Sequence, residues 1–331
     1  MINDDTLVNQ AKAVQQWSEK YFAELEPLIA KRKAEGKVRD CHGDLHLGNM
    51  VQIDKRFLFF DCIEFNQSFR QIDIACEIAF TVMDLEARGM PEAANLLLNT
   101  YLEQGGDYEG LQLVTFYKVY FAVVRAKVSI IHLTGTDPEI IKSHENYPVF
   151  CKYIALAASY AQAPHPFVAL TSGVSGSGKS TLAAKIAART GAIRLRSDVE
   201  RKRLFGLAPE ENSQESIYTP EASEQTFAEL HQLLERVIAA GFPCIVDATF
   251  LKADLRNSFK DQALLAGLPF HILHCHATEE ELVSRIERRQ KKSTDASEAT
   301  VEVMQQQGKD AETFSAEEMP SVINIDTQKP L

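Results

Sequence analysis

The sequence predicts a mostly α-helical domain followed by an α/β domain, in which a parallel sheet is flanked by helices. The chain of 331 residues is long enough to bury two hydrophobic cores. Residues 167–331 alternate short apolar runs with amphipathic segments, as in a doubly wound sheet, whereas residues 1–161 carry mainly helical spacing. Residues 162–166 read Gln-Ala-Pro-His-Pro and predict the linker, because proline ends helices.

The composition is that of an ordinary globular protein. No apolar run is long enough to cross a bilayer, and the N-terminal MINDDTLVNQ is acidic and polar, unlike a signal peptide. The six cysteines are scattered without a C-x-x-C pair, which predicts a reduced, cytoplasmic protein. The His274-Cys275-His276 run is better explained as a strand end than as a metal site, because alternate side chains face opposite sides. The net charge of −11 does not favour nucleic acid as a partner.

A glycine-rich motif follows the first apolar run of the second half. Residues 173–180 read Gly-Val-Ser-Gly-Ser-Gly-Lys-Ser and satisfy the pattern GxxxxGK[ST]. The glycines let backbone N–H groups point inward at phosphate oxygens, and a helix beginning near Lys179 adds its positive end. Lys179 is expected to reach the β- and γ-phosphates and Ser180 to bind Mg²⁺; a plain strand-to-helix turn is the alternative. The predicted ATP site comprises Gly173, Ser175, Gly176, Ser177, Gly178, Lys179, Ser180 and Thr181.

Two aspartates follow later strands. A strand over residues 192–196 ends just before Asp198, whose carboxylate can orient or deprotonate an attacking hydroxyl, or can simply cap the next helix. Arg201 lies three residues further on, on the same face. A later apolar strand ends at Asp247, which is predicted to hold Mg²⁺ opposite Ser180, directly or through another ligand. A loop-capping aspartate is the alternative there.

An arginine-rich helix follows the last of these strands. Thr278 and Glu281 form a capping box at its start, and residues 295–298 suggest the start of another helix. A basic helix end followed by a polar loop is typical of a lid over ATP, whose arginines neutralise the transferring phosphoryl group. Arg285 and Arg289 share a face and are the candidates; an ordinary solvated charged face is the alternative. The polar loop over residues 206–218 is expected to face the substrate.

The first half contains a second group of polar candidates. After a helix over residues 5–35, two short strands are predicted at 50–53 and 57–60. Asp44, Asn49 and Asp61 lie on the loops around these strands: a carboxylate that can orient a hydroxyl, with an amide and a carboxylate that can hold Mg²⁺. Polar loop residues that only tie down a helical lobe are the alternative. Helical segments are predicted from residue 71 to about 160.

The stretches HGDLHLGN and FFDCIEFN resemble the catalytic loop and metal-binding strand of aminoglycoside phosphotransferase-like kinases, which have a protein-kinase-like C-lobe. The resemblance implies that Asp44 is the catalytic aspartate and that Asn49 and Asp61 are metal ligands. Those kinases hold ATP under a separate N-lobe with a glycine-rich loop and a strand lysine, whereas residues 1–37 here predict one helix. The resemblance therefore implies a vestigial site kept as a scaffold, a shortened reading frame, or a site completed by a partner polypeptide that supplies the N-lobe.

The combination of GxxxxGKS, SDVER, IVDATF and the arginine helix resembles small P-loop kinases of the zeta-toxin and polynucleotide-kinase type, over residues 167 to about 325. In that family the residues matching Asp198 and Arg201 bind the substrate, and lid arginines contact the phosphates. The paired halves resemble bacterial two-domain predicted kinases. The expected function is Mg²⁺–ATP-dependent phosphoryl transfer to a hydroxyl of a small molecule, nucleotide or nucleic-acid end. An ATP-switched regulator without a phosphorylated product, or a first-half kinase completed by a partner lobe, is the alternative.

Overall fold

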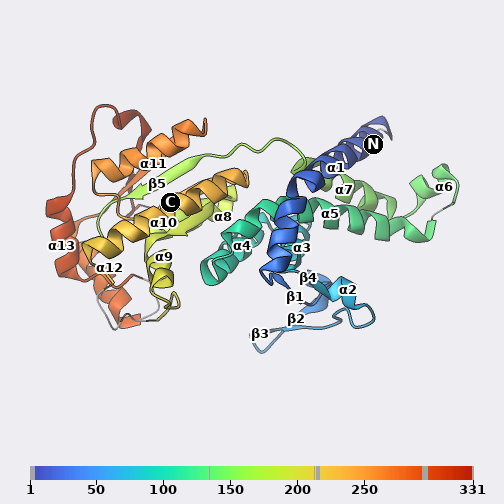
Figure 1. The fold of residues 1–331 in the computed structure, drawn as a ribbon, viewed down its shortest axis with the longest axis horizontal. Helices are drawn as coiled ribbons and strands as arrows, with labels where there is room; N and C mark the ends of the chain where they lie inside the picture. Colours follow the sequence, from blue (N-terminus) through green and yellow to red (C-terminus); the bar gives the residue numbers. More distant parts are fainter. Residues whose placement is uncertain (1–3, 134, 212, 214–216, 293–296, 330–331) are drawn as a thin grey trace. The chain divides into compact units, whose positions relative to one another are not determined.

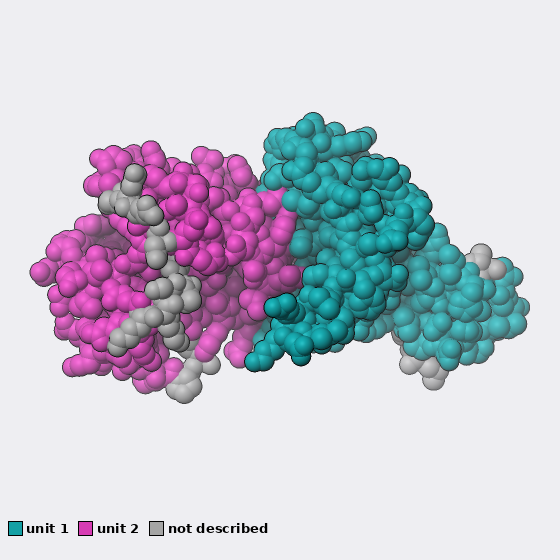
Figure 2. Space-filling model, turned by 90° about the horizontal axis from the view of Figure 1, so that it is seen from below, with its two compact units in different colours: residues 1–94, 109–163 teal, residues 95–108, 164–331 magenta. Residues whose placement is uncertain are grey.

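The computed structural model describes residues 4–133, 135–211, 213, 217–292 and 297–329. The chain divides into two compact units, which Figure 2 distinguishes by colour. The first comprises Met1–Ala94 and Glu109–Ala163, and the second comprises Asn95–Tyr108 and Pro164–Leu331. The segment Asn95–Tyr108, here called the inserted segment, therefore belongs to the second unit, although its position in the sequence suggests the first. Within the described residues, no helix combines the length and apolarity needed to cross a membrane.

The first unit is mainly helical. Its core is formed by apolar side chains such as Phe80, Met83, Val119 and Ala157, which recur at helical spacing. The two aromatic rings of Phe80 and Phe121 stack at a centroid distance of 4.1 Å within this core. The helices are α1 (Asp4–Ala34), α2 (Gln67–Arg70), α3 (Ile74–Ala87), the start of α4 (Pro91–Gly105), α5 (Leu111–Ile130), α6 (Pro138–Ser143) and α7 (Tyr147–Tyr160).

Two small sheets accompany these helices. The predicted hairpin is present as β2 (Met50–Ile53) and β3 (Arg56–Phe59), and both residues of its turn, Asp54 and Lys55, have positive φ, as a two-residue hairpin turn requires. β1 (Val38–Asp40) pairs with β4 (Gln71–Asp73) in antiparallel fashion. The sequence did not predict this pair, because three-residue strands are too short to show alternation.

The second unit is built on a five-stranded parallel sheet with the order β6-β7-β5-β8-β9. The central strand is fully buried, as its continuous apolar run predicts. The chain leaves β5 for the β6 edge, returns through β7, and then crosses to β8 and β9, so the strand order reverses beside β5. A reversal of this kind opens a crevice at the carboxyl ends of the strands. The strands are β5 (Val168–Ser172), β6 (Ile193–Arg196), β7 (Cys244–Asp247), β8 (Phe270–His276) and β9 (Val322–Asp326).

Helices flank this sheet on both faces (Figure 1). The helices predicted near Lys179, after residues 192–196 and at Thr278 begin at Lys179, Ser197 and Glu279. The helix start predicted at residues 295–298 is wrong for the two of these residues that the structure describes, because 297 and 298 are not helical. Residues 295 and 296 lie outside the described residues. The helix begins at Val301, after the cap Thr300. The helices are α8 (Lys179–Thr190), α9 (Ser197–Leu204), α10 (Pro220–Ala239), α11 (Ala253–Leu265), α12 (Glu279–Lys292) and α13 (Val301–Asp310).

The inserted segment is fixed to the β6 side of the second unit by buried polar contacts. The amide of Asn99 accepts a hydrogen bond from the N–H of Arg194 (2.7 Å) and donates one to the C=O of Ala192 (3.0 Å). The hydroxyl of Tyr108 donates to the buried carboxylate of Glu200 (2.8 Å). The two bonds of Asn99 pair backbone groups at the outer edge of β6, and the bond of Tyr108 joins the segment to α9.

Candidate active site

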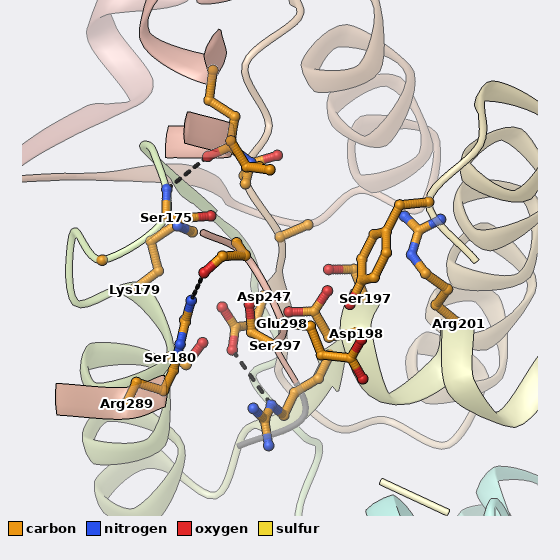
Figure 3. Close-up of a pocket in the computed structure, with 18 of the residues that line it drawn as sticks. Ser175, Lys179, Ser180, Ser197, Asp198, Arg201, Asp247, Arg289, Ser297 and Glu298 are labelled. Atoms are coloured by element: carbon orange, nitrogen blue, oxygen red, sulfur yellow. Dashed lines mark hydrogen bonds and ion pairs between the residues drawn. The ribbon is translucent and has the colours of Figure 1, made fainter. Parts of the chain in front are cut away.

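One cavity of about 840 Å³ lies at the carboxyl ends of β5, β6 and β7. Figure 3 shows its lining residues, drawn from the glycine-rich loop, the strand ends, α12 and the segment before α13. The cavity thus collects most second-half candidates, whereas Gly173 and Ser177 are not among its lining residues. The predicted residues that line it are Ser175, Gly176, Gly178, Lys179, Ser180, Thr181, Asp198, Arg201, Asp247, Arg285 and Arg289.

The glycine-rich loop has the backbone that its sequence predicts. Gly173, Gly176 and Gly178 have φ values of 138°, 83° and 88°, a region that other residues rarely adopt. A Cβ at Gly173 would also lie 2.4 Å from the C=O oxygen of Cys275, so no side chain fits there. Gly178 immediately precedes α8, which places the positive end of that helix at the cavity. The loop can therefore present N–H groups to an anion.

Lys179 is the charged group at the centre of this loop. Its ammonium is buried and donates a hydrogen bond to the C=O of Val174 (2.8 Å). Burial lowers the pKa of Lys179, while the nearby carboxylates of Asp247 and Asp198 act in the opposite direction. The lysine is therefore held inside the loop by one neutral carbonyl, and a phosphate oxygen is a stronger acceptor for it.

Asp247 ends β7 inside the same cavity as Ser180. Its Oδ1 accepts a hydrogen bond from the hydroxyl of Thr171 (3.3 Å). Its Oδ2 is buried without a hydrogen-bond partner among the described residues, and the nearest cationic group is Nε of Arg196 at 3.9 Å. A buried carboxylate oxygen with unused acceptor capacity, in one cavity with a hydroxyl, is a donor set that fits Mg²⁺.

Asp198 lies in the first turn of α9, and Arg196 occupies the cap position, so Asp198 is not the helix cap. Arg201 is largely buried and donates from Nη1 to the C=O of Ile217 (3.1 Å) and to the hydroxyl of Ser223 (3.3 Å). Its Nε has no hydrogen-bond partner among the described residues. Burial lowers the pKa of Arg201, an effect that Asp198 opposes.

Tyr218 is a cavity residue that the sequence analysis did not name individually. The guanidinium of Arg201 lies over its ring, 5.1 Å from the centroid, in a cation–π contact. Tyr218 ends the polar loop predicted to face the substrate, and it lines the cavity together with Phe227 of α10. A tyrosine beside the helix start Thr219-Pro220 was the available signal, but its orientation depends on the tertiary fold.

The two lid candidates make different contacts. Arg285 pairs with Glu281 (Nε to Oε1, 2.7 Å) and donates to the hydroxyl and the C=O of Thr327, 2.8 and 3.1 Å away. Arg289 donates from Nη2 to the C=O of Ala299 (2.8 Å). Arg285 thus ties α12 to the residue after β9, and Arg289 ties it to the segment that precedes α13.

Two further polar side chains were missed. Glu298 accepts hydrogen bonds from the N–H (2.8 Å) and the hydroxyl of Ser213, and it lies 3.2 Å from Nζ of the wholly buried Lys202. Although burial opposes it, these interactions lower the pKa of Glu298. Gln307 of α13 accepts a hydrogen bond from the N–H of Ser175 (2.8 Å). Both contacts join residues more than 80 positions apart, so sequence spacing gives no signal for them.

In the first unit, two of the three polar candidates are in direct contact. Nδ2 of Asn49 donates to Oδ2 of Asp44 (3.1 Å), and His46 lies 3.5 Å from the same oxygen. The interaction with His46 lowers the pKa of Asp44 although burial opposes it. Asp61 is exposed with φ of 60°, and the preceding residue, Phe60, donates its N–H to the C=O of Asn49 (3.1 Å). The structure brings the two loops together; the roles of their side chains remain predictions.

The fold and the cavity define the second unit as an α/β P-loop domain. The family model AAA_33, described as an AAA domain, matches residues 168–313. Uncharacterised proteins of Mycobacterium bovis and Mycobacterium tuberculosis are 27% identical over 289 residues, which cover 86% of this chain and 57% of theirs. The chain thus spans little more than half the length of these relatives.

Two solved structures are also similar to this chain. A gluconokinase from Sinorhizobium meliloti is 21% identical with a TM-score of 0.35, and the match covers 50% of this chain and 86% of that one. The APS kinase of Mycobacterium tuberculosis, in complex with AMPPNP and APS, is 20% identical with a TM-score of 0.33, covering 41% and 78%.

Proposed function

We propose that the second unit is a Mg²⁺–ATP-dependent phosphotransferase that transfers the γ-phosphoryl group to a hydroxyl of a small molecule, a nucleotide or a nucleic-acid end. The supporting observation is the composition of one cavity. It holds Lys179 and Ser180 from the glycine-rich loop, Asp247 from β7 and Asp198 from α9. Phosphoryl transfer needs these parts together: phosphate binding, a metal-holding pair and a carboxylate beside the attacking hydroxyl.

Each side chain has a defined task in this proposal. The loop amides and Lys179 bind the phosphates, and Ser180 and Asp247 would hold Mg²⁺, which neutralises phosphate charge when bound. Asp198 orients the acceptor hydroxyl and takes its proton. Arg201, with an unused Nε in a largely buried side chain, binds the acceptor. Arg285 and Arg289 border the cavity from α12 and stabilise the charge that develops on the transferring group.

The experiment is a transfer assay with ATP labelled at the γ-phosphate, run over a panel of alcohols, sugars, nucleosides and oligonucleotide ends. Once an acceptor is found, Asp198→Asn is expected to lower turnover by roughly a hundred-fold or more, because an amide cannot accept the proton. ATP affinity should stay within about two-fold, because that carboxylate serves the acceptor rather than the nucleotide.

The matched control is Asp254→Asn, an exposed carboxylate on α11, which should leave both quantities unchanged. Full turnover in Asp198→Asn would refute the base assignment. ATP binding without any labelled product, from the panel or from cell extract, would instead favour the ATP-switched regulator.

A further inference from the structure

The inserted segment carries a carboxylate, Glu103, that is linked through two arginines to Ser180 and Asp247, the pair proposed to hold Mg²⁺. Glu103 lies on α4, outside the residues that match the AAA domain model, and its side chain is 13% exposed. Its Oε1 accepts hydrogen bonds from Nε (2.9 Å) and Nη2 (2.7 Å) of Arg194. Its Oε2 lies 3.6 Å from Nη1 of Arg196. One carboxylate thus pairs with two arginines that emerge from the same strand, β6.

Each of these arginines contacts one of the two residues proposed to hold Mg²⁺, Ser180 or Asp247. Nη1 of Arg194 donates to the backbone C=O of Ser180 (3.1 Å), the residue whose hydroxyl is proposed to hold Mg²⁺. Nε of Arg196 lies 3.9 Å from Oδ2 of Asp247, the oxygen left without a hydrogen-bond partner among the described residues. Glu103 is therefore two contacts away from both Ser180 and Asp247, although it is nearly 80 residues from the nearer one.

The charges around Asp247 explain why such a carboxylate matters. Arg196 is a permanent cation that lines the cavity, and a cation beside Oδ2 competes with Mg²⁺ for that oxygen. With Glu103 present, the guanidinium of Arg196 is shared between two carboxylates at similar distances, 3.6 and 3.9 Å. Without the charge of Glu103, the attraction between Arg196 and Asp247 is no longer balanced by that second carboxylate, so Arg196 is drawn toward Oδ2, the acceptor that the metal needs.

We propose that Glu103 is a positioning residue of the nucleotide site: it holds Arg194 and Arg196 so that Ser180 and Asp247 remain available to Mg²⁺. The inference rests on the proposed function and extends it to a segment outside the matched domain. It assigns no chemical step to Glu103, which acts only through the two arginines.

The test is calorimetry of a non-hydrolysable ATP analogue binding to the full chain, with Mg²⁺ and then with EDTA. The readout is the affinity measured with Mg²⁺ divided by the affinity measured in EDTA, here called the ratio. Glu103→Gln keeps the shape and removes the charge. It should reduce this ratio roughly ten-fold, the usual order for residues that orient metal ligands. The affinity in EDTA should change by less than about two-fold, since the loop amides are untouched. Glu92→Gln, an exposed glutamate on the same helix, should leave the ratio unchanged.

Arg196→Met supplies the second arm, which does not depend on the folding of Glu103→Gln. Removal of the competing cation should raise the ratio. In the double variant Glu103→Gln/Arg196→Met, the loss of the Glu103 charge should lower the ratio by less than it does in Glu103→Gln alone, because only the contact through Arg194 is then left to lose. A lower ratio in Arg196→Met, additive effects in the double variant, or equal losses with Mg²⁺ and EDTA in Glu103→Gln would each overturn the inference. No nucleotide uptake by the unaltered protein would refute the proposed function as well.

Discussion

Lys179 illustrates how a single residue can be prepared for a ligand. Its ammonium is withdrawn from water, which lowers its pKa, and the hydrogen bond that it makes is to a carbonyl of its own loop. A neutral carbonyl compensates an ammonium less well than an anion does. A polyphosphate that enters the cavity would replace this weak partner with a charged one. The cost of removing water from the ammonium has already been met in the unliganded fold, so it does not reduce the binding energy.

Lys179→Met therefore separates affinity from stability. The affinity for Mg²⁺–ATP should fall by about 2 to 3 kcal/mol, because a charge-assisted contact is lost. The free energy of unfolding should change by less than about 1 kcal/mol, since methionine fills the space without a buried charge. Calorimetry and chemical denaturation measure the two quantities. Lys185→Met, on the exposed face of α8, is the control, and equal affinity losses in both variants would contradict the assignment.

At the scale of elements, most of the glycine-rich loop and the sheet could be predicted from local patterns. The three glycines take the backbone conformations that their spacing implied, and α8 begins at Lys179. Asp247 is the last residue of its strand, as its sequence suggested. Contacts between distant elements could not be predicted: Lys202 with Glu298, Gln307 with Ser175, and the short pairing of β1 with β4. Each depends on tertiary placement, which neither periodicity nor capping encodes.

The contact between Lys202 and Glu298 joins α9 to the segment that precedes α13, and it carries a prediction at this scale. Lys202 is wholly buried and also donates to the C=O groups of Pro209 (3.2 Å) and Glu211 (2.6 Å). Glu298→Gln removes the negative charge beside this ammonium while keeping an acceptor. The free energy of unfolding near neutral pH should fall by about 2 kcal/mol, because the buried cation loses its anionic partner.

This loss should depend on pH in a defined direction. The pKa of Glu298 is lowered in the folded protein, so its contribution is present above its unfolded pKa and disappears as the pH falls through the folded value, below 4.5. Denaturation of the unaltered protein and of Glu298→Gln should therefore converge at acidic pH. Glu235→Gln, an exposed carboxylate on α10, should match the unaltered protein throughout. A gap that persists after protonation would show that charge is not the cause.

At the scale of the whole molecule, the boundary between the two units does not follow the linker alone. The first unit ends at Ala163 and the second resumes at Pro164, which lies within residues 162–166. The inserted segment, however, lies in the first half of the sequence but belongs to the second unit, where it packs through Asn99, Glu103 and Tyr108. Its helical spacing is the same as that of its neighbours, so periodicity alone assigned it to the helical domain. Its partners on β6 and α9 lie about 90 residues away.

Asn99→Ala tests whether this segment is energetically part of the second unit. The change leaves the N–H of Arg194 and the C=O of Ala192 without partners at a largely buried site, so the second unit should lose about 2 to 4 kcal/mol. Hydrogen exchange on the full chain should show faster exchange in β6 and β7 and unchanged exchange in α3 of the first unit. Asn257→Ala, an exposed site on α11, should leave both regions as they are. Faster exchange in α3 with β6 unchanged would assign the segment to the first unit instead.

Added Mg²⁺–ATP should slow exchange in the same strands that Asn99→Ala accelerates, because a ligand stabilises the unit that binds it.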